Sequence, residues 1–358
     1  MSKRSSNLEK ILDFHIGRII LIVFSIFKIK RKLPNQIRRI GIFKEAALGD
    51  TTLLSGIIRD IKDRYPGITL YFICSSSNVI LGKNLIDEEH VYKIPIKNPA
   101  KSVLMIRKLK LDVLIDFGSW PRINALICLF AGAKFTIGFK TKGQYRHFCY
   151  DQVIEHSNGC HELDNYRNLC RLAKIESSSL PELHTTAQLP PEFKNRKFII
   201  FHPWPSGFKS ELRKWSDVNW KKLIDWSNEN GYEVCFSGSP GEKELNDRLI
   251  GEQKAINLAG KYSFQELLII IKNAQAVVSV NTGIMHIAAA LNVPTIGLSG
   301  PTNDKRWGPL GEKSISIIPN VEGCGYLNLG FEYDGERIDC MEHILFETVV
   351  DALRRVLE

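Results

Sequence analysis

The sequence predicts an α/β protein built from two doubly wound domains, each with a parallel sheet. Apolar runs rich in β-branched residues alternate with amphipathic stretches of helical length, and the alternation pauses at a polar, proline-containing stretch before it restarts. The 358 residues allow each half to bury its own core. Hydrophobic residues make up 44% of the chain and charged residues 24%, which is typical of a globular protein and excludes a disordered or fibrous one.

The predicted elements follow from hydrophobic periodicity. Residues 51–64 place their apolar side chains on one helical face, and Pro66-Gly67 ends this helix. In the first half we expect strands at 40–43, 69–74, 113–117 and 135–138, and helices at 51–64 and 123–130. In the second half we expect strands at 197–202, 233–237, 276–280 and 295–298, and helices at 215–230, 242–250, 264–273, 283–291 and 341–357.

These elements give a domain plan. We expect an N-terminal arm at 1–37, a first domain at 38–183, a linker at 184–196, a second domain at 197–340 and a final helix at 341–358. Two such sheets would offer ligands a cleft at the carboxyl ends of their strands.

The arm concentrates the positive charge of the chain. Residues 1–37 hold eight Lys or Arg and two acidic residues, so they carry six of the nine net charges. The body is therefore nearly balanced, which argues against a nucleic-acid-binding surface. The apolar run 19–27 is too short to span a bilayer, and the basic cluster 28–32 follows it directly. We expect residues 1–33 to rest on an anionic membrane surface; the alternative is a core-packed helix with a solvated basic end.

The eight cysteines form no CxxC pair, and several lie inside apolar runs. We expect them to be reduced and buried in a cytoplasmic protein, without a zinc site.

Three segments carry candidate chemistry. The first is Ala46-Ala-Leu-Gly-Asp50, where Asp50 falls at or just before a helix start and can serve as an N-cap or as a general base. The second follows strand 197–202, where Ser206 lies on a loop with Lys209, Arg213 and Lys214, cations suited to a diphosphate or to a solvated basic loop.

The third segment is the most informative. Strand 276–280 runs into Asn281-Thr282-Gly283 and a small-residue helix, whose N-terminal N–H groups can bind phosphate oxygens. His286 lies about one turn into this helix, and Thr302 lies on the loop after the next strand. A lone helical histidine is more often structural, but this one stands beside a phosphate-type turn.

Together these segments resemble the ADP-heptose:lipopolysaccharide heptosyltransferase family, glycosyltransferase family 9, over about residues 38–357. The matching motifs are Leu48-Gly-Asp50, Lys214-Trp215, Thr282 to Leu291, Gly300-Pro-Thr302 and Cys340-Met341. The resemblance implies a GT-B fold, with an acceptor-binding first domain and a donor-binding second domain. It also implies an inverting transfer of heptose from ADP-heptose to a glycolipid acceptor of the lipopolysaccharide core.

The resemblance assigns roles to single residues. Asp50 would be the general base, and Lys214 would stabilise the leaving diphosphate. The donor would be held by Thr282, Gly283, His286, Glu242 at the ribose, Tyr262 near the base, and the loop residues Ser206, Asn281 and Thr302. The chain has no Asp-x-Asp motif, so we expect no metal and no cofactor beyond the nucleotide sugar. We expect the enzyme on the inner face of the cytoplasmic membrane.

One residue departs from the family pattern. Asn281 stands where well-studied heptosyltransferases have Asp before Thr-Gly. Asn keeps hydrogen bonding but loses the charge, so another nucleotide sugar is an alternative donor. Two further alternatives are a sugar-nucleotide epimerase of the same two-domain shape and a sugar-nucleotide-binding protein without catalysis.

Overall fold

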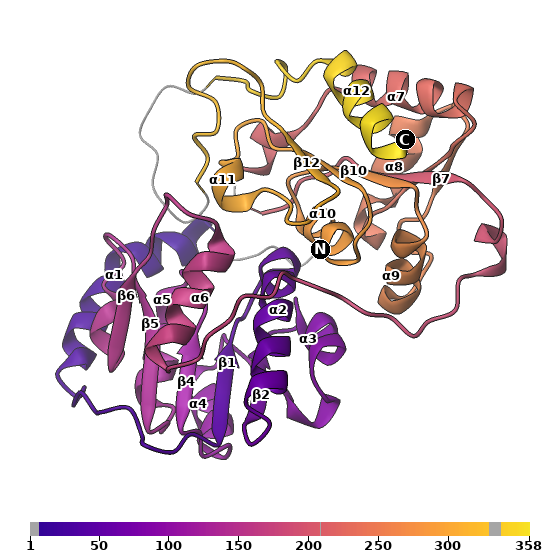
Figure 1. Ribbon diagram of the computed structural model, residues 1–358. Coiled ribbons are helices and arrows are strands. Elements are labelled where there is room, and N and C mark those ends of the chain that lie inside the picture. The colour runs from indigo at the N-terminus through magenta and orange to yellow at the C-terminus, as the bar shows by residue number, and fades with distance from the viewer. Residues whose placement is uncertain (1–6, 208, 329–337) are drawn as a thin grey trace. The chain divides into compact units, whose positions relative to one another are not determined.

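The computed structural model describes residues 7–207, 209–328 and 338–358, and it divides the chain into two compact units (Figure 1). The division falls between Ser179 and Leu180, four residues before the predicted end of the first domain. Residues 1–6 of the predicted arm, Phe208 of the basic loop and residues 329–337 of the second domain lie outside the described residues.

Each unit contains a six-stranded sheet in which all strand pairs are parallel, as the sequence predicts. In the first unit the order is β3-β2-β1-β4-β5-β6, and in the second it is β12-β11-β10-β7-β8-β9. The strands of the first sheet are β1 Arg39–Phe43, β2 Thr69–Cys74, β3 Val91–Lys93, β4 Val113–Asp116, β5 Phe135–Lys140 and β6 Gln152–Glu155. Those of the second are β7 Phe198–His202, β8 Glu233–Phe236, β9 Ala255–Asn257, β10 Ala276–Val280, β11 Thr295–Leu298 and β12 Ser314–Ile317.

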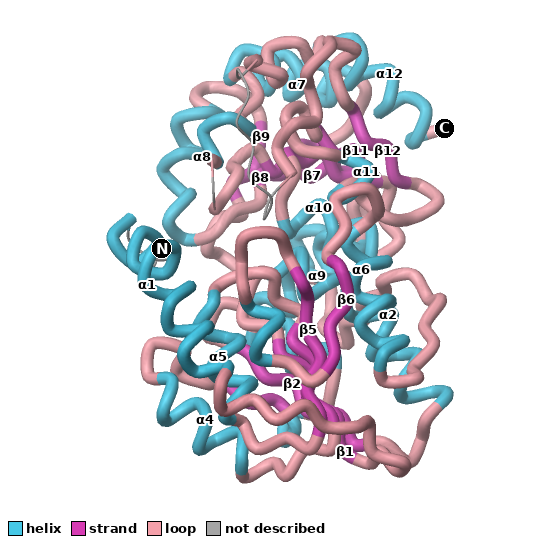
Figure 2. The backbone as a smooth tube through the Cα atoms, turned by 90° about the vertical axis from the view of Figure 1, so that its left-hand side faces the viewer, coloured by secondary structure: helices cyan, strands magenta, loops and turns pink. Residues whose placement is uncertain are grey.

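Helices cover both faces of each sheet (Figures 1 and 2). In the first unit α1, α4 and α5 pack together in one layer, and α2, α3 and α6 form the other. These helices are α1 Asn7–Ser25, α2 Leu48–Arg64, α3 Val79–Leu85, α4 Pro99–Arg107, α5 Arg122–Phe130 and α6 Glu162–Leu172, with the short 3-10 helices η1 Glu88–His90 and η2 Arg146–Cys149. Since the central strands are buried on both faces, they read as continuous apolar runs in the sequence.

The second unit has the same plan. Helices α7, α8 and α12 pack along one face of its sheet, and α9 contacts α10 on the other. The helices are α7 Asp217–Glu229, α8 Lys243–Ile250, α9 Phe264–Lys272, α10 Gly283–Ala290, α11 Asp304–Trp307 and α12 Phe346–Leu357, with η3 Pro191–Phe193, η4 Ser210–Arg213 and η5 Pro240–Glu242. The last helix begins at Phe346 rather than at the predicted residue 341. Cys340 and Met341 instead belong to a turn before the helix, where both side chains are buried.

The N-terminal arm is not a separate segment. Asp13 accepts a hydrogen bond from Arg122 at 2.8 Å, and Lys28 pairs with the buried Asp151 at 2.8 Å. Leu21 is fully buried against α5. The described part of the predicted arm therefore packs on the first unit, where α1 completes one helix layer. Within the described residues, no helix combines the length and the apolar character needed to cross a bilayer.

Two cysteines correct the prediction that all eight are reduced. Cys324 and Cys340 form a disulfide with a Cα–Cα distance of 5.7 Å. The 16-residue separation gave no motif, and only the return of the chain toward α12 brings the two residues together. The other six are free, and burial raises the pKa of the thiols of Cys74, Cys149, Cys170 and Cys235 to about 12, which makes them inert.

Candidate functional site

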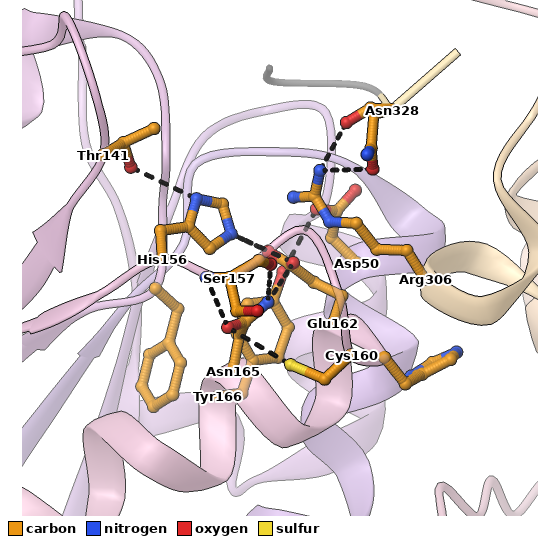
Figure 3. Close-up of polar contacts among 12 residues, drawn as sticks. Asp50, Thr141, His156, Ser157, Cys160, Glu162, Asn165, Tyr166, Arg306 and Asn328 are labelled. Atoms are coloured by element: carbon orange, nitrogen blue, oxygen red, sulfur yellow. Dashed lines mark hydrogen bonds and ion pairs between the residues drawn. The ribbon is translucent and has the colours of Figure 1, made fainter. Parts of the chain in front are cut away.

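In the first unit, Asp50 is the third residue of α2, so the helix begins three residues earlier than predicted. Lys44, the residue directly after β1, donates to Asp50 Oδ1 at 2.9 Å. The Tyr166 hydroxyl on α6 donates to the same oxygen at 3.1 Å (Figure 3). Neither bond uses Oδ2, and the Asp50 side chain is 25% exposed. The carboxylate is thus held through Oδ1, while its side chain stays partly exposed.

Lys44 is the centre of this arrangement. Its ammonium also donates to the backbone carbonyl of Phe117, directly after β4, at 3.2 Å. It therefore bridges the loops after β1 and β4, the two strands at which the strand order of the sheet reverses, where ligands of doubly wound folds bind. Burial opposes its charge, but the attraction of Asp50 and Glu45 outweighs burial, and the pKa of Lys44 is raised.

Glu45 lies beside this lysine. Burial raises the pKa of Glu45 to about 7, with Lys44 opposing the rise and the carboxylate of Asp116 adding to it. Its Oε2 is buried and makes no hydrogen bond to the described part of the chain. A Cβ on Gly118 would lie 3.2 Å from this oxygen and 3.0 Å from Asp116 Oδ1, so the loop after β4 requires glycine here.

Helix α6 owes its position to a buried polar network (Figure 3). His156 Nε2 lies 3.0 Å from Glu162 Oε2, and its Nδ1 lies 3.1 Å from the Thr141 hydroxyl. Asn165 donates to the same Glu162 oxygen at 3.1 Å and to the Ser157 carbonyl at 2.9 Å. The network fixes the first turn of the helix that presents Tyr166 to Asp50.

In the second unit, the predicted phosphate-type turn is present. Asn281, Thr282 and Gly283 connect β10 to α10, and Thr282 is the N-cap residue without capping the helix through its side chain. The Thr282 side chain therefore does not occupy the N–H groups in the first turn of α10. Such N–H groups can donate hydrogen bonds to a ligand. His286 is buried on α10, with 5% of its surface exposed.

Arg213 ties this turn to the basic loop. Its guanidinium donates to the carbonyl oxygen of Asn281 at 2.8 Å and to that of Ser206 at 2.6 Å. It joins the loops after β10 and β7, the reversal point of the second sheet, as Lys44 does in the first. Arg213 is buried, whereas Lys214 is exposed. Of these two neighbouring cations, Arg213 is thus structural and Lys214 is accessible to a ligand.

The Asn281 side chain has a specific partner. Its Nδ2 donates to the backbone carbonyl of Trp307 at 2.9 Å, and the residue is 3% exposed. A carboxylate could not donate this bond. Near the carboxyl end of the adjacent strand β11, Thr302 is fully buried; its hydroxyl and the Trp307 indole N–H find no hydrogen-bond partner among the described residues.

The remaining predicted donor residues are more distant from this turn. Glu242 is buried after β8, where its Oε2 accepts from the Ser239 backbone N–H at 2.7 Å as part of a capping box. Tyr262 follows the edge strand β9, three strands from β10, and its hydroxyl donates to Glu192 at 2.8 Å. Near β10 and β7 the structure groups Ser206, Lys214, Asn281, Thr282, Gly283 and His286, and leaves Tyr262 at the sheet edge.

Within the described ranges, no three His, Cys, Asp or Glu side chains gather as they would around a metal ion.

Comparison with known proteins identifies the family. Residues 106–325 match the model of glycosyltransferase family 9 (heptosyltransferase). Lipopolysaccharide heptosyltransferase 3 of Escherichia coli is 35% identical over 303 residues, which cover 75% of this chain and 85% of that protein. The chain belongs to glycosyltransferase family 9.

Other relatives match the present chain over shorter stretches. Lipooligosaccharide heptosyltransferase 2 of Haemophilus influenzae is 38% identical over 117 residues, 31% of this chain and about a third (34%) of the relative. Among solved structures, the E. coli ADP-heptose heptosyltransferase II has a TM-score of 0.71 at 21% identity, covering 89% of this chain and 98% of its own. The E. coli heptosyltransferase WaaC with ADP has a TM-score of 0.70 at 19% identity, covering 89% and 99%. These structures confirm the predicted GT-B fold.

Sequence reasoning missed three residues that lie at the candidate site. Lys44 and Glu45 lie directly after β1 and could have been noticed as charged residues that end a buried strand. Tyr166 is 116 residues from Asp50, and only the fold brings the two together.

Proposed function

We propose that this family 9 member is an inverting heptosyltransferase that moves heptose from ADP-heptose to a hydroxyl of a lipopolysaccharide core or related glycolipid. The observation that carries the proposal is the partly exposed Asp50 carboxylate, whose Oδ1 accepts hydrogen bonds from Lys44 and Tyr166. A positioned carboxylate of this kind is what a general base requires.

The proposed reaction assigns one step to each group. Asp50 removes the proton of the acceptor hydroxyl as its oxygen attacks the anomeric carbon from the face opposite the leaving group. The new C–O bond forms while the bond to the diphosphate breaks, ADP leaves, and the anomeric configuration inverts. The ammonium of Lys44 and the hydroxyl of Tyr166 both bind Oδ1 of this carboxylate and so fix its orientation before the attack.

On the second unit we propose the donor site. The N–H groups at the start of α10 and the exposed Lys214 would stabilise the diphosphate as negative charge develops on it. The Thr302 hydroxyl, which has no hydrogen-bond partner among the described residues, would contact the donor. His286 would also contact the donor, and Glu242 would bind the ribose. The proposed mechanism uses no metal and no cofactor besides the nucleotide sugar.

A second candidate donor follows from Asn281. Well-studied members of the resembled family have Asp at this position, and the amide here is committed to the Trp307 carbonyl. A family 9 transferase of the same mechanism that uses another nucleotide sugar is therefore the runner-up. Family membership favours either transferase over a sugar-nucleotide epimerase.

We propose a peripheral location on the inner face of the cytoplasmic membrane, where a glycolipid acceptor is embedded. The exposed basic residues Lys30 and Lys32 support contact with an anionic surface.

The test is Asp50→Asn, which keeps the shape of the side chain and removes the basic oxygen. We expect kcat to fall by roughly 10²- to 10⁴-fold, while calorimetry shows unchanged affinity for the donor. Asp63→Asn, an exposed carboxylate on the same helix, is the matched control and should keep full activity. Near-normal turnover of Asp50→Asn would refute the general-base assignment, and loss of turnover in both variants would point to the helix rather than to the carboxylate.

A further inference from the structure

The exposed apolar side chains of this protein are concentrated in one segment. Of the sixteen large hydrophobic side chains exposed in the described chain, eight lie between residues 16 and 29. Such a concentration marks an interaction surface, because scattered single residues are the norm on soluble proteins.

Helix α1 has two distinct faces. Asp13, Gly17, Leu21 and Phe24 recur every three or four residues and face α5, where Gly17 approaches Arg122 closely. Ile16, Ile19 and Val23 recur with the same spacing on the outward face and are 48%, 63% and 51% exposed. The helix is thus docked by one face and leaves a second apolar face uncovered.

A groove adjoins α1 at Phe24, one of the residues that face α5. Phe24 is 39% exposed and lies edge-on to Phe130 of α5 at 5.7 Å. From there a groove of about 460 Å³ runs between α5 and α4, and its lining is apolar except for Arg107. Its lining residues are Phe24, Pro99, Ala100, Val103, Leu104, Arg107, Ile123, Leu126, Ile127 and Phe130. The volume lies within the range of small-molecule sites, roughly 300–1,000 Å³.

The charged residue that lines the groove is a cation, and further cations lie near it on α4. Arg107 lies in its wall, and Lys101 and Lys108 lie one turn before and after Leu104 on α4. The exposed Lys30 and Lys32 follow the apolar segment of α1. None of the described residues that line the groove is acidic. An apolar surface surrounded by cations fits an anionic phospholipid, whose acyl chain is apolar and whose phosphate is negative.

We propose that α1, α4 and α5 form a fixed membrane-docking face on which the groove takes an acyl chain of an anionic phospholipid and the surrounding cations bind lipid phosphates. This deepens the proposed membrane location, on which it rests, by replacing a loose arm with a preformed surface of the first unit. Because the helix is already docked, binding does not have to order it.

The first experiment measures binding of the full-length protein to vesicles of phosphatidylcholine with and without phosphatidylglycerol. We expect binding only with the anionic lipid, and a loss of roughly tenfold or more in Leu104→Ser and in the double variant Ile19→Ser/Val23→Ser. Val218→Ser is the matched control, because Val218 is 62% exposed and Leu104 60%, but Val218 belongs to the second unit. Binding of the Leu104 and Ile19/Val23 variants equal to that of the unmodified protein would overturn the proposal.

The second experiment locates the acyl chain. With vesicles whose acyl chains carry bromine, we expect additional tryptophan quenching in Leu104→Trp and none in Val218→Trp. Equal quenching in both would overturn the groove assignment. Concentration-dependent dimerisation without lipid, abolished by Leu104→Ser, would instead make this face a contact between two copies. No donor or acceptor is used, so failure of the docking face and failure of the transferase proposal are distinguishable.

Discussion

At the residue scale, Asn281 accepts one hydrogen bond and donates another, and the two bonds connect its turn to two other segments of the second unit. Its backbone carbonyl accepts from Arg213 and its side-chain amide donates to Trp307. In Asn281→Asp a carboxylate would face that carbonyl in a buried site, and we expect the free energy of unfolding to fall by about 1–3 kcal/mol. Urea unfolding measures this loss. Asn35→Asp, at an exposed position, should change nothing, and equal stability of the two variants would contradict the account.

Glu45 gives a pH-dependent prediction. The pKa of Glu45 is raised from its ordinary value of 4.5 to about 7 in the folded protein, so folding favours the protonated carboxyl. The stability that this group contributes is therefore fully present below pH 4.5 and is lost as the pH rises through 7. Glu45→Gln removes this loss, and we expect it to raise the free energy of unfolding at pH 8 by about 1–3 kcal/mol and to have a smaller effect at pH 5. Parallel urea titrations at the two pH values measure the difference.

The control for Glu45 is the exposed Glu229, whose replacement by Gln should be neutral at both pH values. A Glu45→Gln variant that is less stable than the unmodified protein at pH 8 would show that the ionised carboxylate is needed where it lies.

At the element scale, the docking of α1 depends on Gly17. A Cβ at this position would lie 3.1 Å from Arg122 Cδ, so a larger side chain pushes the helix away from α5. We expect Gly17→Leu to lower the melting temperature, at a cost of about 1–3 kcal/mol, and to expose residues 28–38 to trypsin. Gly67→Leu is the matched control, because no atom lies within 4 Å of a Cβ built there. Identical protease resistance in both variants would mean that α1 is not held by this contact.

The elements also show what the sequence could predict. The central strands β4, β7, β10 and β11 are runs buried on both faces, and β1 and β2 are largely buried. The positions of all six were therefore predicted to within a residue or two. The edge strands β3, β6, β9 and β12 are three or four residues long and partly exposed, and they lack a clear pattern. For α1, the structure shows one packed face and one exposed face, and contact of the exposed face with a membrane stays a prediction. Periodicity alone could not show which side meets α5.

At the candidate site, too, some residues could be placed from the sequence and others could not. Residues near a helix start that follows a strand, such as Asp50 in α2 and Thr282 before α10, could be placed at the candidate site because the parallel fold collects strand ends at one edge. Partners from distant elements could not. Tyr166 and the Trp307 carbonyl are selected by tertiary packing, and nothing in the local sequence around Asp50 or Asn281 indicates them.

At the scale of the whole molecule, the two units repeat one design. When the strands of each unit are numbered one to six along the chain, both sheets have the spatial order 3-2-1-4-5-6. Each has a buried cation, Lys44 or Arg213, that bridges the loops after its first and fourth strands. In the first unit this cation orients a carboxylate, and in the second it fixes the turn before α10. The repeated scaffold thus holds Asp50 on one unit and the turn before α10 on the other, the two places where we propose the base and the diphosphate site.

The most direct test of the central claim is a transfer assay read by mass spectrometry of the acceptor. The protein is incubated with a heptose-deficient lipopolysaccharide acceptor and, separately, with ADP-heptose, a UDP-sugar or a GDP-sugar. The account predicts addition of one heptose from ADP-heptose with release of an equal amount of ADP, and no transfer from the other donors. Transfer from a UDP- or GDP-sugar alone, or conversion of a free sugar nucleotide without any change in the acceptor, would contradict it.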